Sequence, residues 1–176
     1  MRPQTHMTTS STIRPATAAD FAAIRTVVYE VWPIAYREMI TPEQIAYMLT
    51  MMYSDDALNK QVNEEGCVFL LSERDSNIEG FASYAPLSNH AFKLHKLYVY
   101  SSLHGRGIGK ALLNTVKQQV KDAGGTSLEL QVNKKNVAQH FYTQQGFVID
   151  HELVLDIGDG FVMDDYVMKA LLSAGD

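Results

Sequence analysis

The chain has 176 residues and a formal net charge of −5 at pH 7, and this length suits one domain with a sizeable hydrophobic core. The mild negative charge argues against a nucleic-acid partner, because such proteins concentrate Lys and Arg on one face. No apolar run approaches the roughly 18 residues that span a membrane, and no signal-peptide core is recognisable. The lone cysteine, Cys67, cannot form an internal disulfide. A globular protein in the cytoplasm is therefore expected.

The N-terminal third of the chain reads as helical after a short strand. Residues 1–10 are polar and rich in Thr and Ser, and we expect a flexible tail there, followed by one domain over residues 11–176. Apolar residues at helical spacing predict helices over residues 21–31, 42–52 and 54–64. Pro33 is expected to end the first of these helices or to open the next turn.

The remainder alternates strand and helix patterns, separated by turn residues. Runs of β-forming residues predict strands over residues 68–74, 78–85, 91–100, 127–132, 147–155 and 161–168. Helical spacing begins at Ile108 and stops at Gly124, and a second helix follows Asn136 and ends at Gly146. This order of elements predicts a mixed α+β sheet.

A glycine-rich loop joins the strand ending near residue 100 to the helix that starts at Ile108. Gly105, Gly107 and Gly109 alternate with Arg106 and Ile108. Backbone without Cβ atoms approaches a ligand closely, and a helix N-terminus carries partial positive charge. Together these features predict a phosphate or pyrophosphate site, to which Arg106 and the following Lys110 could add charge. An ordinary glycine turn is the alternative.

The spacing of this loop excludes two well-known phosphate motifs. A P-loop needs Gly five residues before the Gly-Lys pair and Ser or Thr after it, but His104 and Ala111 occupy these positions around Gly109. A dinucleotide fingerprint needs Gly three residues after Gly107, where Lys110 stands.

What remains resembles the pyrophosphate loop of the GNAT superfamily of acyl-CoA-dependent N-acyltransferases, with the pattern Gln/Arg-x-x-Gly-x-Gly/Ala. Gly107 and Gly109 match the pattern, and His104 departs from it. A second stretch is similar to the family pattern Asn-x-x-Ala-x-x-Phe-Tyr-x-x-x-Gly-Phe. In this sequence one residue, and not two, separates the Asn from the Ala. The matching residues are Asn136, Ala138, Phe141, Tyr142, Gly146 and Phe147.

The resemblance implies a GNAT-like α+β fold with a mostly antiparallel sheet of about seven strands and flanking helices. Its central strands, 91–100 and 127–132, would splay apart and receive the pantetheine arm of acetyl-CoA beside Leu97 and Val99. The other coenzyme contacts that the resemblance implies are His104, Gly105, Arg106, Gly107, Ile108, Gly109, Lys110 and Asn136.

Acetyl transfer to an amine needs a proton acceptor and a proton donor, because an alkylamine has a pKa near 10.4 and the departing thiolate must be protonated. Tyr142 is similar to the family tyrosine beside the coenzyme sulfur and is the predicted acid; core packing with Phe141 is its alternative. Strand alternation places His95 on the face of Leu97 and Val99 and makes it the predicted base. A structural histidine is its alternative, and Glu129 on the neighbouring strand is the second candidate.

The acceptor is expected between the N-terminal helices and the last hairpin, where Trp32, Tyr36, Glu129, Asp164 and Asp165 could face it. Carboxylates beside an aromatic wall suit a polyamine, and the N-terminal section loosely resembles bacterial polyamine-type acetyltransferases. The alternatives are a peptide or protein N-acetyltransferase with an open groove, and a catalytically silent CoA-binding sensor.

Two further expectations concern metals and assembly. The histidines lack the spacing of metal ligands, so no metal is expected at the site. Edge strands in the C-terminal hairpin leave room for a homodimer.

Overall fold

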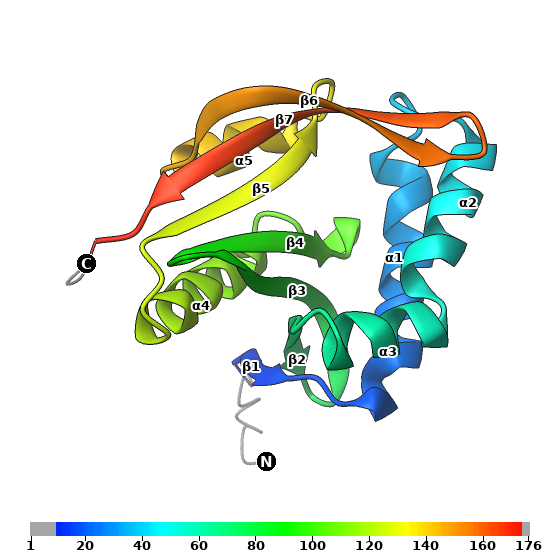
Figure 1. Ribbon diagram of the computed structural model, residues 1–176. Coiled ribbons are helices and arrows are strands. Elements are labelled where there is room, and N and C mark those ends of the chain that lie inside the picture. Colours follow the sequence, from blue (N-terminus) through cyan, green and yellow to red (C-terminus); the bar gives the residue numbers. More distant parts are fainter. Residues whose placement is uncertain (1–9, 174–176) are drawn as a thin grey trace, which may run out of the picture.

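The protein forms a seven-stranded sheet in the order β1-β2-β3-β4-β5-β7-β6, as Figure 1 shows for the computed structural model, which describes residues 10–173. Only β4 and β5 pair in parallel; the other neighbouring strands are antiparallel. This confirms the expected α+β fold. The tail expected over residues 1–10 lies, apart from Ser10, outside the described residues. The strands are β1 (Thr12–Pro15), β2 (Val68–Arg74), β3 (Asn77–Ser88), β4 (Ala91–Val99), β5 (Ser127–Asn133), β6 (Val148–Gly158) and β7 (Phe161–Leu171).

The helices cover both faces of the sheet. One buried cluster joins α1, α2 and α3 to the sheet, and a second joins α4 to the opposite face, where α5 also packs. None of the helices in the described part of the chain has the length and hydrophobicity that crossing a membrane requires. The helices are α1 (Phe21–Ala35), α2 (Pro42–Tyr53), α3 (Asp55–Asn63), α4 (Ile108–Asp122) and α5 (Ala138–Gln144), with short 3-10 turns η1 (Ala18–Asp20) and η2 (Ser101–Leu103).

The first helix is longer than its sequence pattern predicts. α1 continues through Pro33 to Ala35, and the N–H of Tyr36 closes its last turn on the carbonyl oxygen of Trp32 at 3.0 Å. Trp32 is buried to 2 % exposure in the core, and this packing holds the last turn in helical conformation although Pro33 lacks an N–H. The expectation that Pro33 ends the helix or opens the next turn is therefore wrong.

A β-bulge interrupts β4 at His95. Ser83 of β3 pairs with Lys96, whereas the next residue, Tyr84, pairs with Leu94, so His95 is an extra residue in the strand. An extra residue breaks the alternation of side chains between the two faces. As a result His95 shares a pocket with Lys96, and Leu97 packs on the opposite cluster around α4. The predicted placement of His95 on the face of Leu97 is wrong for this reason.

The central strands separate beyond the bulge. β4 pairs with β5 only from Ala91 to Leu94, against Ser127 to Leu130. Past Leu94 the two strands diverge, and a gap opens between the C-terminal half of β4 and the end of β5 (Figure 1). This is the expected splay, and it places an opening in the middle of the sheet.

The β6–β7 hairpin extends past the sheet to α2, at the right of Figure 1. The Tyr47 hydroxyl donates to the carbonyl oxygen of Ile157 at 3.0 Å, and Gln44 Nε2 donates to that of Val162 at 2.9 Å. The Tyr47 ring also packs on Phe161, with 5.3 Å between centroids. The hairpin is thereby anchored across the side of the sheet where the strands splay.

Candidate active site

The loop before α4 is shaped by backbone conformation. Gly105 and Gly107 have φ angles of 81° and 79°, in the left-handed region that favours glycine. A Cβ on either residue would meet nothing within 4 Å, so conformation and not space demands glycine here. Because Gly107 occupies the N-cap, no side chain bonds to the first N–H groups of α4, and they remain available to ligand oxygens. The loop fits a pyrophosphate.

Two further features connect this loop with the opening in the sheet. His104 Nε2 donates to the carbonyl oxygen of Val99 at 3.0 Å, so His104 ties the loop to the end of β4. Leu97 and Val99 pair with Ala82 and Gly80 of β3, and their other side borders the gap toward β5. Backbone on that side can pair with the amides of a pantetheine arm.

The loop geometry predicts the effect of replacing Gly107 with Ala. A Cβ strains the left-handed conformation and displaces the first N–H groups of α4, so we expect the Kd of CoA to rise about tenfold. Isothermal titration calorimetry measures this change. Gly160→Ala is the matched control, because Gly160 has a φ of 78° and open space around it in the distant β6–β7 turn. Equal CoA affinity in both variants would contradict the assignment of the loop.

Tyr142 lies on α5, close enough to Tyr36 and Tyr98 to interact with them electrostatically. Its ring packs between Phe141 and Phe147, with centroids 5.3 and 5.8 Å away. Within residues 10–173 its hydroxyl forms no hydrogen bond. Burial, together with the nearby Tyr36, raises the pKa of Tyr142 well above its usual range, which keeps the phenol protonated. Asn136, upstream of α5, accepts a hydrogen bond from the N–H of Ala138 at 2.8 Å and so fixes the start of this helix.

An aromatic wall from α1 and β4 meets Tyr142 at the gap. The hydroxyl oxygens of Tyr36 and Tyr98 lie 2.9 Å apart, and the pKa of each is raised by burial. Trp32 packs behind them, with its ring 4.9 Å from Tyr36 and 5.9 Å from Tyr98. Since Trp32 is 2 % exposed, it supports the wall from the core, whereas Tyr36 is only partly buried.

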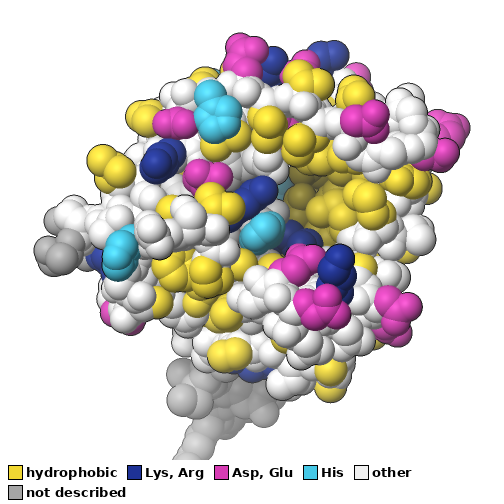
Figure 2. All heavy atoms as spheres, viewed as in Figure 1, with side chains coloured by type: hydrophobic (Ala, Val, Ile, Leu, Met, Phe, Trp, Pro, Cys, Tyr) yellow, Lys and Arg dark blue, Asp and Glu magenta, His cyan; other side chains and the backbone are white. Residues whose placement is uncertain are grey.

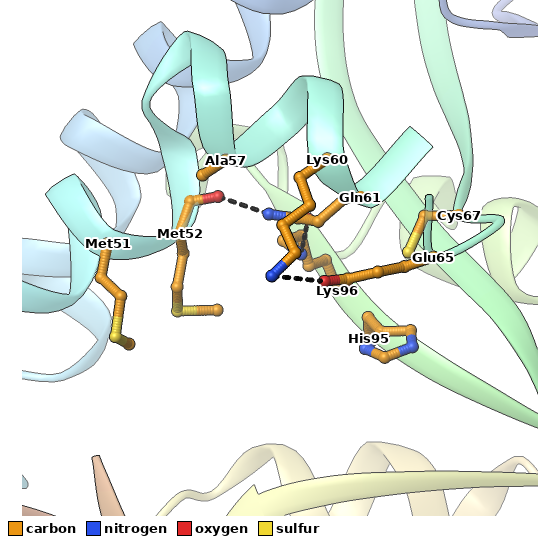
Figure 3. Close-up of a pocket in the computed structure, with 9 residues that line it drawn as sticks. All are labelled: Met51, Met52, Ala57, Lys60, Gln61, Glu65, Cys67, His95 and Lys96. Carbon is orange, nitrogen blue, oxygen red and sulfur yellow. Dashed lines mark hydrogen bonds and ion pairs between the residues drawn. The ribbon is translucent and has the colours of Figure 1, made fainter. Parts of the chain in front are cut away.

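His95 and Lys96 open into a pocket of about 280 Å³ beside α2 and α3 (Figure 3). Lys96 Nζ donates to Gln61 Oε1 at 2.6 Å, and burial lowers the pKa of Lys96 to about 8. Desolvation by the surrounding pocket, with the charges of Lys96 and Lys93, lowers the pKa of His95 to about 4, although the residue remains exposed to solvent. The imidazole is therefore neutral at pH 7 and lies in cationic surroundings. The other lining residues are Met51, Met52, Ala57, Lys60, Glu65 and Cys67.

The acidic residues predicted to face the acceptor occupy different environments. Glu129 pairs with Lys93 in the β4–β5 register, below the point where the strands separate. Asp164 is exposed and forms an ion pair with Lys134 Nζ at 2.8 Å. Its neighbour Asp165 is 3 % exposed, on the opposite face of β7. Strand alternation in the sequence places these two carboxylates on opposite faces, but it does not say which one is buried.

Sequence periodicity did not predict the basic environment of His95. Lys93 and Lys96 lie near His95 on β4, and sequence periodicity gives no signal that their charges lower the pKa of His95.

In the described part of the chain no three His, Cys, Asp or Glu side chains are grouped to hold a metal ion, and the expected absence of a metal stays a prediction.

Comparison with known proteins identifies the family that this chain resembles. The family model described as acetyltransferase (GNAT) domain matches residues 36–165. An uncharacterized N-acetyltransferase in the pepI 3′ region of Lactobacillus delbrueckii subsp. lactis is 24% identical over 140 residues, covering 75% of this chain and 81% of that protein.

Solved structures of similar fold include the PaiA N-acetyltransferase of Thermoplasma acidophilum in complex with coenzyme A, at 25% identity and a TM-score of 0.77, covering 92% of this chain and 99% of that one. The ribosomal-protein-S18-alanine N-acetyltransferase of Escherichia coli shares the fold at 16% identity and a TM-score of 0.70, covering 95% and 97% of the two chains. Because the family model spans more than half of the chain and includes both the glycine loop and Tyr142, this protein belongs to the GNAT family of acetyl-CoA-dependent N-acetyltransferases.

Proposed function

We propose that this acetyltransferase acts on the primary amine of a small, polyamine-like molecule, by direct attack and without a covalent enzyme intermediate. The observation that carries the proposal is the gap between β4 and β5, which has the glycine loop at one end and the aromatic wall of Tyr36 and Tyr98 at the other. Figure 2 shows a hollow lined mainly by hydrophobic side chains, with basic and histidine side chains at its edge.

The anchored hairpin supports a small acceptor over a peptide. A peptide substrate needs an open groove along the site, whereas the β6–β7 hairpin here is held on α2 by Tyr47 and Gln44. A cleft bounded in this way by aromatic side chains suits a short aliphatic amine. The buried Asp165, which lies near Tyr36, would supply negative charge for an ammonium group.

Different groups of the protein would bind the coenzyme, stabilise the acetyl oxygen and donate the proton. Acetyl-CoA supplies an acetyl group already activated as a thioester. The glycine loop would hold the pyrophosphate, and a backbone N–H of β4 near Val99 would stabilise negative charge on the acetyl oxygen. Tyr142 would donate a proton to the sulfur as the C–S bond breaks, since its raised pKa keeps the donor protonated at neutral pH.

The sequence proposes His95 as the base, and this assignment stays a prediction. A pKa of about 4 makes its imidazole a weaker proton acceptor than an ordinary histidine. The adjacent Lys96 also opposes the approach of a cationic amine. Glu129, the second candidate, lies in the paired part of the sheet.

The proposal is tested by measuring CoA thiol release from acetyl-CoA with spermidine, spermine, short aliphatic monoamines, aminoglycosides and short peptides. We expect turnover with the polyamines and lower kcat/KM with the monoamines, because these lack a second cationic group. Turnover with peptides alone would assign a peptide N-acetyltransferase. CoA binding without thiol release from any amine would favour the sensor.

Two expectations from the sequence carry over as predictions. The reaction is placed in the cytoplasm, and a homodimer is expected through exposed strand edges in the β6–β7 hairpin. Size-exclusion chromatography with light scattering measures the assembly directly.

A further inference from the structure

The side chain of Asp165 is a buried carboxylate without a bonding partner. Asp165 is 3 % exposed, and within residues 10–173 its carboxylate oxygens form neither a hydrogen bond nor an ion pair, although they keep a small contact with solvent. Buried charges in proteins are normally paired, because burial without a partner costs several kcal/mol. The adjacent Asp164, by contrast, is exposed and lies 2.8 Å from Lys134 Nζ. Lys93 and Lys134 lie within electrostatic range of Asp165, but neither forms an ion pair with it.

The position of Asp165 gives it access to the acceptor side of the opening. On β7 it pairs with Asn133, the last residue of β5, and this lies past the segment where β5 pairs with β4. Burial and, to a smaller extent, the charge of Asp165 raise the pKa of Tyr36, so the Asp165 carboxylate lies near the end of α1. Tyr36 in turn acts on Tyr142. Asp165 and Tyr142 thus both lie near Tyr36.

We propose that Asp165 is the catalytic base, whose carboxylate holds the acceptor amine and removes its proton, directly or through one water. This inference rests on the proposed function. The acceptor first loses one proton from its ammonium group to solvent through the Asp165 carboxylate. The amine nitrogen then bonds to the acetyl carbon, the C–S electron pair passes to sulfur, and the N–H proton passes to Asp165. Sulfur takes the phenol proton of Tyr142, and solvent returns the Asp165 proton to the phenolate.

The charges around Asp165 suit this role. Burial and the neighbouring Asp164 raise the pKa of Asp165 to about 6, while Lys93 and Lys134 oppose the rise. A carboxylate with this pKa is ionised at pH 7.5 and accepts a proton more readily than an ordinary Asp, whose pKa is about 3.9. Lys93 of β4 and Tyr36 at the end of α1 lie within electrostatic range of Asp165, and Glu129 of β5 and Lys169 of β7 lie farther along the same face of the sheet. Asp164 and its partner Lys134, which is also bonded to Glu152, act from the other face of β7.

The test compares Asp165→Asn with Asp164→Asn, its matched control on the same strand, using the polyamine of highest wild-type turnover. We expect D165N to lower kcat about 100- to 1,000-fold, and D164N to stay within about threefold. In the wild type, log(kcat/KM) should rise with pH with a slope near 2 below about pH 6 and near 1 above it. The two ionisations are those of Asp165 and the amine, so D165N should keep a slope of 1 throughout.

Two additional measurements separate a catalytic from a structural role. D165N should bind CoA like the wild type and melt at an equal or higher temperature at pH 8, because no hydrogen bond is lost. A lower melting temperature for D165N would overturn the assignment, as would a retained kcat. His95→Gln serves as the rival variant: if it alone removes the steep segment below pH 6, His95 is the base.

The outcomes also distinguish this inference from the proposed function. A wild-type enzyme that acetylates polyamines together with an equally active D165N overturns the base and leaves the function intact. A wild-type enzyme that releases no thiol with any amine overturns both.

Discussion

Tyr142→Phe is expected to lower kcat about 100- to 1,000-fold while the Kd of CoA changes less than about twofold. The substitution removes only the hydroxyl, and that group forms no hydrogen bond within residues 10–173, so folding and ring packing against Phe141 and Phe147 should persist. What is lost is the proton for the departing thiolate. Stopped-flow or steady-state thiol release measures kcat, and calorimetry measures CoA binding.

The matched control for this variant is Tyr84→Phe. Tyr84 is also a buried tyrosine, but its hydroxyl donates to Gln119 Oε1 at 2.6 Å on α4, on the N-terminal side of the β4 bulge. We expect that control to retain kcat and to lose about 1 kcal/mol of unfolding free energy from the broken hydrogen bond. A Tyr142→Phe enzyme with wild-type kcat would show that solvent protonates the thiolate and would remove Tyr142 from the mechanism.

The pH dependence provides a second check on the acid. The pKa of Tyr142 is raised, so its phenol stays protonated above pH 10, and kcat should show no loss from this group at mildly alkaline pH. A fall in wild-type kcat between pH 8 and 9 that is absent in Tyr142→Phe would contradict the raised pKa.

Gly80→Ala is expected to destabilise the fold by about 2–3 kcal/mol and to reduce activity as well. A Cβ on Gly80 would lie 2.5 Å from the carbonyl oxygen of Tyr98 and 2.9 Å from the Cα of Val99. Both atoms belong to the backbone of β4, so the clash cannot be relieved by turning a side chain. The strand must move at the segment expected to pair with pantetheine, which couples the loss of stability to weaker CoA binding.

Gly109→Ala is the control for this steric effect. Its Cβ would lie at ordinary contact distances, 3.8 Å from Phe141 Cζ and 3.9 Å from Val99 Cγ2. Because Gly109 lies in the first turn of α4, Ala there should leave the unfolding free energy unchanged or raise it by about 0.5–1 kcal/mol. Urea denaturation at pH 7.5 compares the two variants. Equal midpoints would show that β3 and β4 have room for a methyl group at Gly80.

Some features of this protein follow from its sequence because they depend on neighbouring residues. Gly105 and Gly107 adopt left-handed conformations that other residues avoid, so the strand, loop and helix are recognisable without any tertiary information. The same holds for the start of α2, where Thr41 Oγ1 accepts the N–H of Gln44 at 3.1 Å. These local signals follow one another along the chain in the order typical of the GNAT family. Together they predicted the fold, the coenzyme loop and the position of Tyr142 on α5.

Other features were decided by residues that are distant in the sequence. The bulge at His95 arises from the register with β3, so strand alternation predicted the wrong face for that side chain. Trp32 is buried in the core because α1 packs on the sheet. The different environments of Asp164 and Asp165 depend on Lys134 pairing with one carboxylate and on burial of the other. Periodicity identifies secondary structure, whereas desolvation and charge pairing depend on which elements meet, and those determine which carboxylate can act as a base.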